Sequence, residues 1–518
     1  MTSLYLFRQL LLLLCVALGV LLQTSVAEAQ ANFDGRLLGA RTSMMGGAGA
    51  ALGSDQSTAF INPAGLTRIP GQKFAFSTFV ATLNIRTIPD FYDPTGSLNL
   101  SQSSALDADI RVIPNSFCLF LDGPVKDHFS GRSRHKFAAC GADTEYDSFF
   151  AAKNSTAKTS DGIAAAQSDF SGIIFRRTSM ALTWGMQVTP KMSVGTNLRV
   201  DFTSLRDETS TSAYTEDGGV GNLAVADVNR SSYSWDTSVT VGITYELSKA
   251  VTLGAALSTP SQHIYGYHVA NSTLSFSAGG EAGMVQDNGD FRYNLPTSVR
   301  LALAFAWPTF TFEVDAAFYG GQKQLAVAEF DRQVTGFRDV TLLAQEGGRA
   351  QLVERGVPVT NLFAGFEKFI DSNFSFMAGA QTAFSGLVKR QETLLDDALF
   401  RQRKNAVYAS AGVMSYGSAG SLLLGLRSHY GWGTMLSTDV FSTNAKLKPL
   451  SQREFSLSLV VSGQINFRAV RDTALRAVRP LSAIPDALGD PAGSDATDPK
   501  NPYDTSGGPD SAVWKLRR

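Results

Sequence analysis

The sequence is poor in the residues from which metal centres and short catalytic motifs are built. Its 518 residues include three cysteines and five histidines, and none is spaced as a pair of metal ligands. It contains neither a Gly-x-Ser-x-Gly elbow nor a phosphate-binding loop. These absences argue against a metal site, a bound cofactor and an enzymatic function.

The chain also lacks net charge and long internal apolar runs. Its formal net charge is -1, which argues against nucleic acid as a partner. Hydrophobic residues make up 44% of the chain, yet beyond the N-terminus no stretch reaches the roughly 18 apolar residues that a membrane helix needs. The apolar residues must therefore be distributed over shorter elements.

One apolar run does stand at the N-terminus. Arg8 precedes an apolar stretch from Leu10 to Leu22, and Ala27 and Ala29 follow in an A-x-A arrangement. This pattern is typical of a secretory signal peptide, here residues 1–29, cleaved before Gln30. A transmembrane anchor is the alternative, but the run is short and a cleavage site follows it.

Strict alternation of apolar and polar residues is the strongest pattern in the rest of the chain. Between Tyr233 and Leu247 the odd-numbered positions are mostly apolar and the even-numbered ones mostly polar, as expected for strands with two different faces. Trp235 and Tyr245 lie on the apolar face, roughly 25 Å apart along the axis of a tilted barrel, which is the height of a lipid-facing band between aromatic girdles. A soluble β-sandwich shows the same period, but its strands usually have about five or six residues.

These segments predict an all-β fold, a 14-stranded antiparallel transmembrane β-barrel over residues 73–467. The predicted strands are Phe74–Ile85, Ile113–Leu121, His135–Ala142, Ile174–Val188, Met192–Leu205, Tyr233–Leu247, Val251–Ile264, Pro296–Trp307, Thr309–Gly320, Thr360–Phe369, Asn373–Phe384, Asn405–Met414, Ser421–Tyr430 and Glu454–Phe467. Short joints alternate with long ones, as periplasmic turns and extracellular loops do in outer-membrane barrels. The joint from Asp122 to Arg134 is longer than its counterparts on that side, so the exact pairing of strands two and three is left open.

Residues 30–72, before the barrel, are rich in small residues and cannot form a core of their own. Their motifs contain Gly46, Gly47, Ala48, Asp55, Asn62, Pro63, Ala64 and Gly65. These motifs resemble the N-terminal hatch of FadL/OmpP1/TodX-type outer-membrane transporters of hydrophobic compounds, where the hatch fills the barrel lumen. An ordinary glycine-rich turn region ending in an Asn-Pro turn is the alternative.

The resemblance, which extends over residues 32–467, implies passive uptake of a hydrophobic small molecule such as a long-chain fatty acid or an aromatic hydrocarbon. It further implies a monomer in the bacterial outer membrane, surrounded by outer-membrane lipids and inserted by the barrel assembly machinery. In that family the ligand enters at a groove among the loops, passes to a pocket above the hatch and leaves sideways through the wall. A non-transport barrel, either an adhesin or a secretion-system component, is the alternative, and an outer-membrane lipase or protease is a more distant one.

Three sets of residues are candidates for functional roles in such a barrel. Inward-facing polar residues are predicted to form a lumen network that holds the hatch: Arg199, Asp201, Arg300, Glu313, Asp315, Arg427 and His429. A ligand-capture groove is predicted in the loop between Gly321 and Val359, with a loop helix as the alternative; it contains Phe330, Phe337, Leu342 and Leu343. The tail, residues 468–518, is predicted to be a mostly disordered periplasmic segment, with a partner-binding role as the alternative.

Cys118 and Cys140 remain after removal of the signal peptide. An even cysteine count in an oxidising compartment favours a disulfide. If strands two and three form a hairpin centred near residue 129, these cysteines lie equally far from the centre and face one another. Two unpaired thiols are the alternative.

Overall fold

The computed structural model describes residues 32–34, 38–92, 104–124, 133–158, 164–217, 220–277, 281–336, 348–388, 391, 393–394, 398–439 and 446–467. The predicted signal peptide and the predicted C-terminal tail lie outside these residues.

Within the described residues, fourteen strands close into an antiparallel barrel. In ring order they are β1 (Lys73–Ile88), β2 (Ala105–Asp122), β3 (His135–Lys158), β4 (Ala164–Thr189), β5 (Met192–Asp217), β6 (Val220–Ser248), β7 (Val251–Ser258), β10 (Ser298–Trp307), β11 (Phe310–Tyr319), β14 (Val359–Phe369), β15 (Phe374–Ala383), β17 (Gln402–Gly417), β18 (Gly420–Asp439) and β19 (Lys446–Asn466). The ring closes where β19 pairs with β1, from Lys73↔Asn466 to Thr87↔Arg453. The predicted 14-stranded antiparallel barrel is confirmed.

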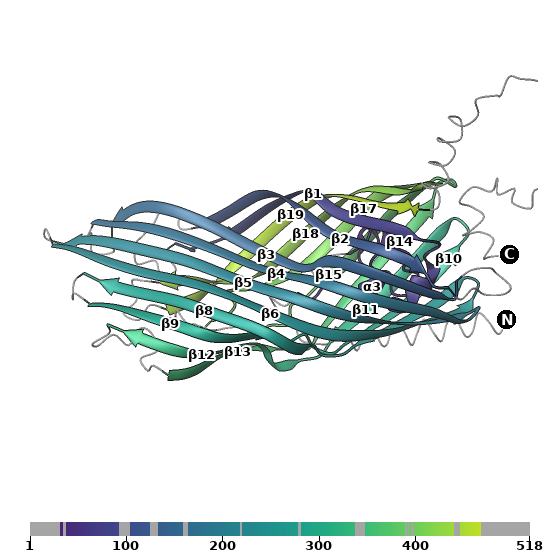
Figure 1. Cartoon of the computed structure of the whole chain (residues 1–518). Helices are drawn as coiled ribbons and strands as arrows, with labels where there is room; N and C mark the ends of the chain where they lie inside the picture. The colour runs from purple at the N-terminus through teal and green to yellow at the C-terminus, as the bar shows by residue number, and fades with distance from the viewer. Residues whose placement is uncertain are drawn as a thin grey trace, which may run out of the picture.

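At the end opposite the short turns the strands continue far beyond the ring, as Figure 1 shows at the left. Four further strands prolong β7, β10, β11 and β14 beyond short kinks: β8 (Gln262–Phe276), β9 (Glu281–Tyr293), β12 (Gln322–Thr335) and β13 (Gly348–Gly356). The hairpins β3–β4 and β5–β6 run alongside them, and β6 pairs with β7 first and with β8 further along. We call this second tier of strands the extension.

The extension corrects the predicted long loops. The segments predicted as loops at 143–172, 206–232, 265–295 and 321–359 consist mainly of β-hairpins in their described parts. On β9 and β12 the reason is that the two faces exchange character there, whereas on β4 and β5 inward residues such as Asp169 and Thr209 stay polar. On β12, Ala326, Ala328 and Phe330 face inward and are buried, while Asp331 is exposed.

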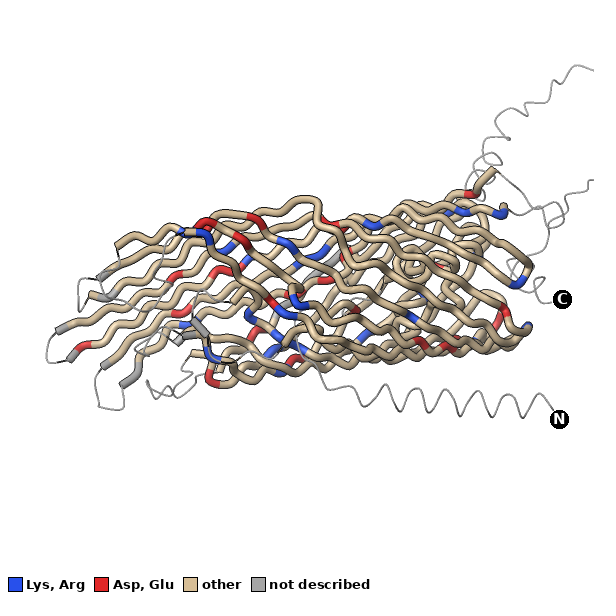
Figure 2. The backbone as a smooth tube through the Cα atoms, turned by 90° about the horizontal axis from the view of Figure 1, so that it is seen from below, with Lys and Arg blue, Asp and Glu red and all other residues tan. Residues whose placement is uncertain are grey.

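The outer face of the barrel carries the predicted apolar band. Trp235 and Tyr245 are both exposed, and so are Val239, Val241 and Ile243 between them. Charged residues are most frequent toward the extension and its junction with the barrel (Figure 2). The barrel thus presents apolar side chains outward, whereas the outer face of the extension is mixed, with exposed Asn229 and Asp331 but also exposed Phe170 and Tyr214.

The predicted hatch segment, of which residues 32–34 and 38–72 are described, lies within the ring of strands (Figure 1). It contains two one-turn helices, α2 (Arg41–Met44) and α3 (Thr58–Ile61), and the 3₁₀-helix η1 (Pro63–Arg68). Across the ring, α2 lies against β15, β17 and β18, whereas η1 lies against β3 to β6. A further two-residue strand, β16 (Thr393–Leu394), pairs with β19.

No helix in the described part of the chain is long and apolar enough to cross a membrane.

Candidate functional site

Asp55 organises the interior of the hatch segment. One carboxylate oxygen accepts a hydrogen bond from the Thr42 backbone N–H at 2.9 Å, and the other accepts one from the Ser57 backbone N–H at 3.0 Å. The hydroxyl groups of both residues also donate to this carboxylate. Helices of four residues are too short to be stable alone, so this buried carboxylate is what joins α2 to α3.

Asn62 performs the corresponding role at the start of η1. Its side-chain amide donates to the carbonyl oxygens of Ala50, at 2.6 Å, and of Ile243 in β6, at 3.1 Å. Its side-chain oxygen accepts from the Ala64 N–H, and Pro63 takes the first helical position. The Asn-Pro motif therefore both begins η1 and attaches it to the wall.

A belt of glycines lines the inner wall where the hatch segment touches it. At each belt position, a Cβ atom would lie between 2.0 and 3.1 Å from atoms of the hatch segment; the belt consists of Gly185, Gly195, Gly242, Gly254, Gly365, Gly379, Gly412 and Gly425. Several are cross-strand partners, including Gly365↔Gly379 and Gly412↔Gly425. At Gly195, Gly254, Gly365 and Gly379 the nearest atoms belong to the backbone of the hatch segment, which therefore lies directly on the wall there. At Gly242, Gly412 and Gly425 the nearest atoms belong to the side chains of Asn62 and Met44.

Two wall carboxylates of β11 hold the glycine-rich turn of the hatch segment. Asp315 accepts the backbone N–H groups of Gly49 and Ala50 at 3.0 and 3.1 Å, and Glu313 accepts those of Ala51 and Leu52 at 2.6 and 3.2 Å. Each carboxylate therefore accepts hydrogen bonds from two successive backbone amides. Such bonds are strong because the acceptor is charged.

Two arginines complete this attachment. Arg300 of β10 donates to Asp315 at 3.0 Å and to the carbonyl oxygen of Gly47. From the hatch segment itself, Arg41 reaches Glu367 of β14 at 2.7 Å. These charges are buried, and each has an opposite partner, as buried charges require.

A cavity of about 100 Å³ lies between the hatch segment and the wall. Its lining combines apolar side chains with three arginines; the main contributors are Phe33, Leu38, Phe60, Leu295, Phe363, Arg177, Arg199 and Arg300. Each guanidinium faces a carboxylate: Arg177 lies 3.3 Å from Glu145, Arg199 lies 2.9 Å from Asp201, and Arg300 binds Asp315. The lining also includes hydroxyl groups and the Asp34 carboxylate, which accepts hydrogen bonds from Tyr319 and Asn361. Because its charged groups have partners, this mixed lining suits an uncharged occupant with a large apolar part.

An apolar core fills the extension directly beyond this cavity. It contains Phe175, Tyr293, Leu295, Phe330, Leu399 and Phe400, and Phe33 of the hatch segment packs against it. Because Leu295 and Phe33 also line the cavity, the apolar core and the cavity adjoin. Porin lumens are polar, whereas the lumen of this extension contains an apolar core beside buried ion pairs such as Arg401–Asp207.

The wall between β2 and β3 is only partly paired. Between the described residues of these strands, the ladder runs from Asp122↔Lys136 to Ser116↔Ala142. Beyond Ser116, β2 stays paired with β1 and β3 with β4, so a seam separates the two strands. A register shift in β3 falls between Asp143 and Glu145, and Thr144 at this shift lines the cavity.

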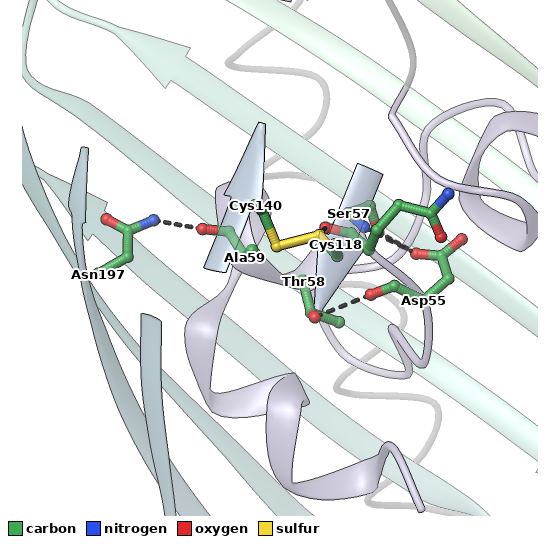
Figure 3. Close-up of a disulfide and its surroundings, with 8 residues drawn as sticks. Asp55, Ser57, Thr58, Ala59, Cys118, Cys140 and Asn197 are labelled. Atoms are coloured by element: carbon green, nitrogen blue, oxygen red, sulfur yellow. Dashed lines mark hydrogen bonds between the residues drawn. A yellow bond between two sulfur atoms is a disulfide. The ribbon is translucent and has the colours of Figure 1, made fainter. Parts of the chain in front are cut away.

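Cys118 and Cys140 face each other in the paired part of β2 and β3 and form a disulfide, with Cα atoms 4.1 Å apart. Figure 3 shows the bond beside α3 of the hatch segment, close to Ala59, whose carbonyl oxygen accepts a hydrogen bond from Asn197. The disulfide thus lies at the closed end of the seam and against the hatch segment.

Comparison with known proteins is possible through structure alone. No family model matches the sequence, and no curated protein matches it. Solved structures with similar architecture include a Pseudomonas aeruginosa FadL homologue (10% identity, TM-score 0.53, covering 84% of this chain and 99% of that one) and the Pseudomonas putida toluene transporter TodX (15%, 0.52, 85% and 100%). The Ralstonia pickettii toluene transporter TbuX is also similar (14%, 0.50, 84% and 99%). The chain has the FadL/TodX-type fold.

Within this FadL/TodX-type fold, the predicted lumen network falls into three groups. Arg300, Glu313 and Asp315 contact the hatch segment, and Arg300 also lines the cavity. Arg199 lines the cavity from β5 and pairs with Asp201. In contrast, Arg427 lies over the ring of Tyr408 at 4.0 Å, and His429 contacts Glu454 at 2.9 Å, both on β18. Arg199 and Arg300 meet at the cavity, whereas Arg427 and His429 lie on β18, in another sector of the ring, and do not line it.

The predicted capture groove differs from the structure. Phe330 is buried on β12 within the apolar core, whereas Phe337, Leu342 and Leu343 lie outside the described residues. The alternative of a loop helix is wrong for the described part, which forms β12 and β13. The groove therefore has no counterpart in the described strands, and Phe330 contributes to the lumen instead.

Sequence reasoning missed the glycine belt, the Arg41–Glu367 ion pair and Phe400. The belt left a readable signal, since Gly195 occupies an inward position between Ser193 and Asn197 in an alternating strand. Phe400 left none, because it lies outside any strand. Among the residues that the structure describes, no group of His, Cys, Asp and Glu side chains is arranged to hold a metal ion.

Proposed function

We propose that this protein takes up hydrophobic small molecules passively across the bacterial outer membrane. The observation that carries the proposal is the cavity between an anchored hatch segment and an apolar lumen, with every lining arginine paired to a carboxylate. TodX and TbuX, which share the fold, are toluene transporters. Aromatic hydrocarbons and long-chain fatty acids are the substrate classes we propose.

The proposed route begins in the extension. Removing apolar surface from water contributes roughly 25 cal/mol per Å², so an apolar lumen draws in a hydrophobic ligand without an energy source. The ligand then reaches the cavity, below which the hatch segment, proposed to comprise residues 30–72, acts as a plug. The seam between β2 and β3, which the cavity reaches at Thr144, is the proposed exit through the wall.

The membrane setting follows from the outer face. Outer-membrane lipids would surround the exposed apolar band that includes Val239, Val241 and Ile243. The alternating last strand, β19, would be recognised by the barrel assembly machinery, and the ring is complete in one chain, so we propose a monomer. A lumen without an apolar pocket would have favoured an adhesin or a secretion-system component.

Uptake can be tested with vesicles whose outer leaflet contains lipopolysaccharide, which slows unaided diffusion of hydrophobic compounds. We expect the protein to accelerate entry of radiolabelled toluene or oleate, but not of glucose, in the absence of any ion gradient. Equal rates for protein-containing and empty vesicles with both hydrophobic probes would contradict the proposal.

A matched pair of variants tests the cavity itself. Ala317 on β11 lines the cavity, whereas its neighbour Ala316 lies on the opposite, outward side of the strand. Ala317→Leu should fill most of the cavity and reduce uptake, and Ala316→Leu should leave the rate unchanged. Equal effects of the two substitutions would show that the cavity is not on the route.

A further inference from the structure

We propose that the Phe400 ring occupies a ligand-binding slot in the lumen, which a benzene-sized aromatic ring or an alkyl segment of similar width takes when Phe400 moves out. The proposal deepens the proposed function and rests on it for the role of the slot in uptake. The existence of the slot as a binding site rests on the packing around Phe400 and does not depend on transport.

The slot has the geometry of an aromatic binding site. The Phe400 ring packs at right angles to that of Phe175, with centroids 5.6 Å apart, and to that of Tyr293, with centroids 6.0 Å apart. Phe175 and Tyr293 are themselves 5.4 Å apart and come from β4 and β9. Such edge-to-face contacts are the arrangement that aromatic rings prefer, so a ligand ring in place of Phe400 would make the same contacts.

The slot adjoins the cavity. Phe400, Leu295 and Phe33 belong to one apolar cluster, and the latter two also line the cavity of about 100 Å³. Vacating the slot therefore enlarges an existing space. Apolar cavities of roughly 150 Å³ lined by Leu, Ile and Phe stay dry and bind benzene, so the combined space has the size and lining to accept such a ring.

The backbone that carries Phe400 is attached by side chains rather than by a sheet. Ala398 to Phe400 precede β17 and belong to no strand. Glu354 of β13 accepts the backbone N–H groups of Leu399 and Phe400 at 3.0 and 3.1 Å, and Arg230 of β6 donates to the carbonyl oxygen of Ala398. Phe400 can therefore move by breaking these side-chain hydrogen bonds alone. A residue within a β-strand would have to break the backbone hydrogen bonds of its sheet as well.

Ion pairs stabilise the occluded position. Arg401 binds Asp207 of β5 at 2.7 Å, and Arg230 lies 3.9 Å from the same carboxylate. All three residues are buried. An incoming ligand must therefore compete with Phe400. Its apparent affinity equals the affinity for the open slot multiplied by the fraction of molecules in which the slot is open.

Phe400→Ala tests the slot directly, because it removes the competing ring. Toluene binding to the purified, detergent-solubilised protein is measured by equilibrium dialysis. We expect the variant to bind toluene roughly tenfold more tightly than the wild type, or more. The matched control is Phe149→Ala, which removes an equally buried ring from a different apolar cluster and should not change toluene binding.

A second variant keeps the Phe400 ring and loosens its attachment. Glu354→Gln weakens the two hydrogen bonds to the backbone of Leu399 and Phe400 and should give a smaller gain in toluene affinity. Glu329→Gln on β12 is its control, since Glu329 pairs with Arg292 on the half-exposed outer side. If Phe400→Ala fails to fold, as judged by heat-modifiability on gels, the Glu354→Gln comparison decides.

The outcomes separate the slot from the proposed function. Unchanged toluene affinity in Phe400→Ala, or in Glu354→Gln where the first variant does not fold, overturns the slot, and so does an equal gain in the controls. Failure of the wild type to accelerate uptake into vesicles, together with tighter binding by Phe400→Ala, overturns the transport role and leaves the slot in place.

Discussion

The glycine belt makes the most demanding prediction, because it requires the hatch segment to lie against the wall at fixed points. A Cβ atom at Gly365 would lie 2.2 Å from the carbonyl oxygen of Met45, and one at Gly379 would lie 2.2 Å from the backbone nitrogen of Gly46. Both contacts are with the backbone of one tight turn, which is also fixed by Arg300 through Gly47. The turn cannot move away without breaking that contact.

The size of the effect follows from overpacking. Forcing a methyl group into a packed interior costs about 1–3 kcal/mol, so Gly365→Ala should destabilise the folded barrel by an amount in this range. The double substitution Gly365→Ala/Gly379→Ala should cost less than the sum of the two, because both displace the same turn. Gly320→Ala is the control: the nearest atom to its Cβ would be 3.5 Å away, an ordinary contact.

The assay is the midpoint of heat-modifiability on gels, measured in the full chain and in a form lacking residues 30–66. In the shortened barrel the belt faces an empty lumen, so the cost of Gly365→Ala should disappear. The shortened form should also let small polar dyes leak from liposomes, because its plug is gone. A cost that persists after the deletion would refute the idea that the belt accommodates the hatch segment, and unchanged dye leakage would refute the plug.

Three further predictions concern charge, disulfide and pH. Arg300→Leu should lower the thermal midpoint more than Arg300→Leu combined with Asp315→Asn, because the single change leaves a buried carboxylate without its cation; equal midpoints would count against the pair. Reduction of the Cys118–Cys140 bond, with a sequence separation of 22, should destabilise by about 3 kcal/mol, which thermal midpoints with and without reductant would reveal. In the extension, burial lowers the pKa of His268 from 6.5 to about 3, so the unfolded chain takes up the proton first as the pH falls and stability is lost below about 6.5. At pH 5 the loss is about 2 kcal/mol, and His268→Gln should flatten the dependence of the midpoint on pH between 6.5 and 5; an unchanged slope would exclude His268 as its source.

The ring of strands was predictable because one physical constraint acts on every strand of the barrel. Lipid outside and a polar lumen inside impose period two without interruption, as on β10 and β11, whose register brings Arg300 of one strand diagonal to Asp315 of the other. The disulfide was predictable for a different reason: if β2 and β3 form a hairpin, its symmetry places Cys118 opposite Cys140, and the observed register has them opposite.

The site was predictable only where the residue type itself indicates a role, as a charged residue at an inward strand position does. Inward carboxylates such as Glu313 pointed to a lumen network, and the structure adds that Glu313 and Asp315 bind successive amides of the hatch segment. Phe400 was not predictable, because its position depends on side chains from β5, β6 and β13 that lie far away in the sequence. Long-range contacts of this kind carry no local period.

The extension was missed for a reason that β6 makes plain, and that other sequences of this fold class would share. Near the turn end of β6, outward Trp235 is apolar and inward Asp236 is polar; nearer the tip, inward Val228 is buried and apolar while outward Asn229 is exposed and polar. The period stays two and the even-numbered residues stay inward. The outward residues change from polar to apolar between Ser231 and Tyr233, and the inward ones from apolar to polar between Val228 and Arg230. A search for a lipid-facing stripe stops at this point, although the strand continues. The change itself marks where lipid gives way to water outside and where the apolar core of the extension begins inside, so the same feature that hid the extension from the sequence locates the core beyond the cavity.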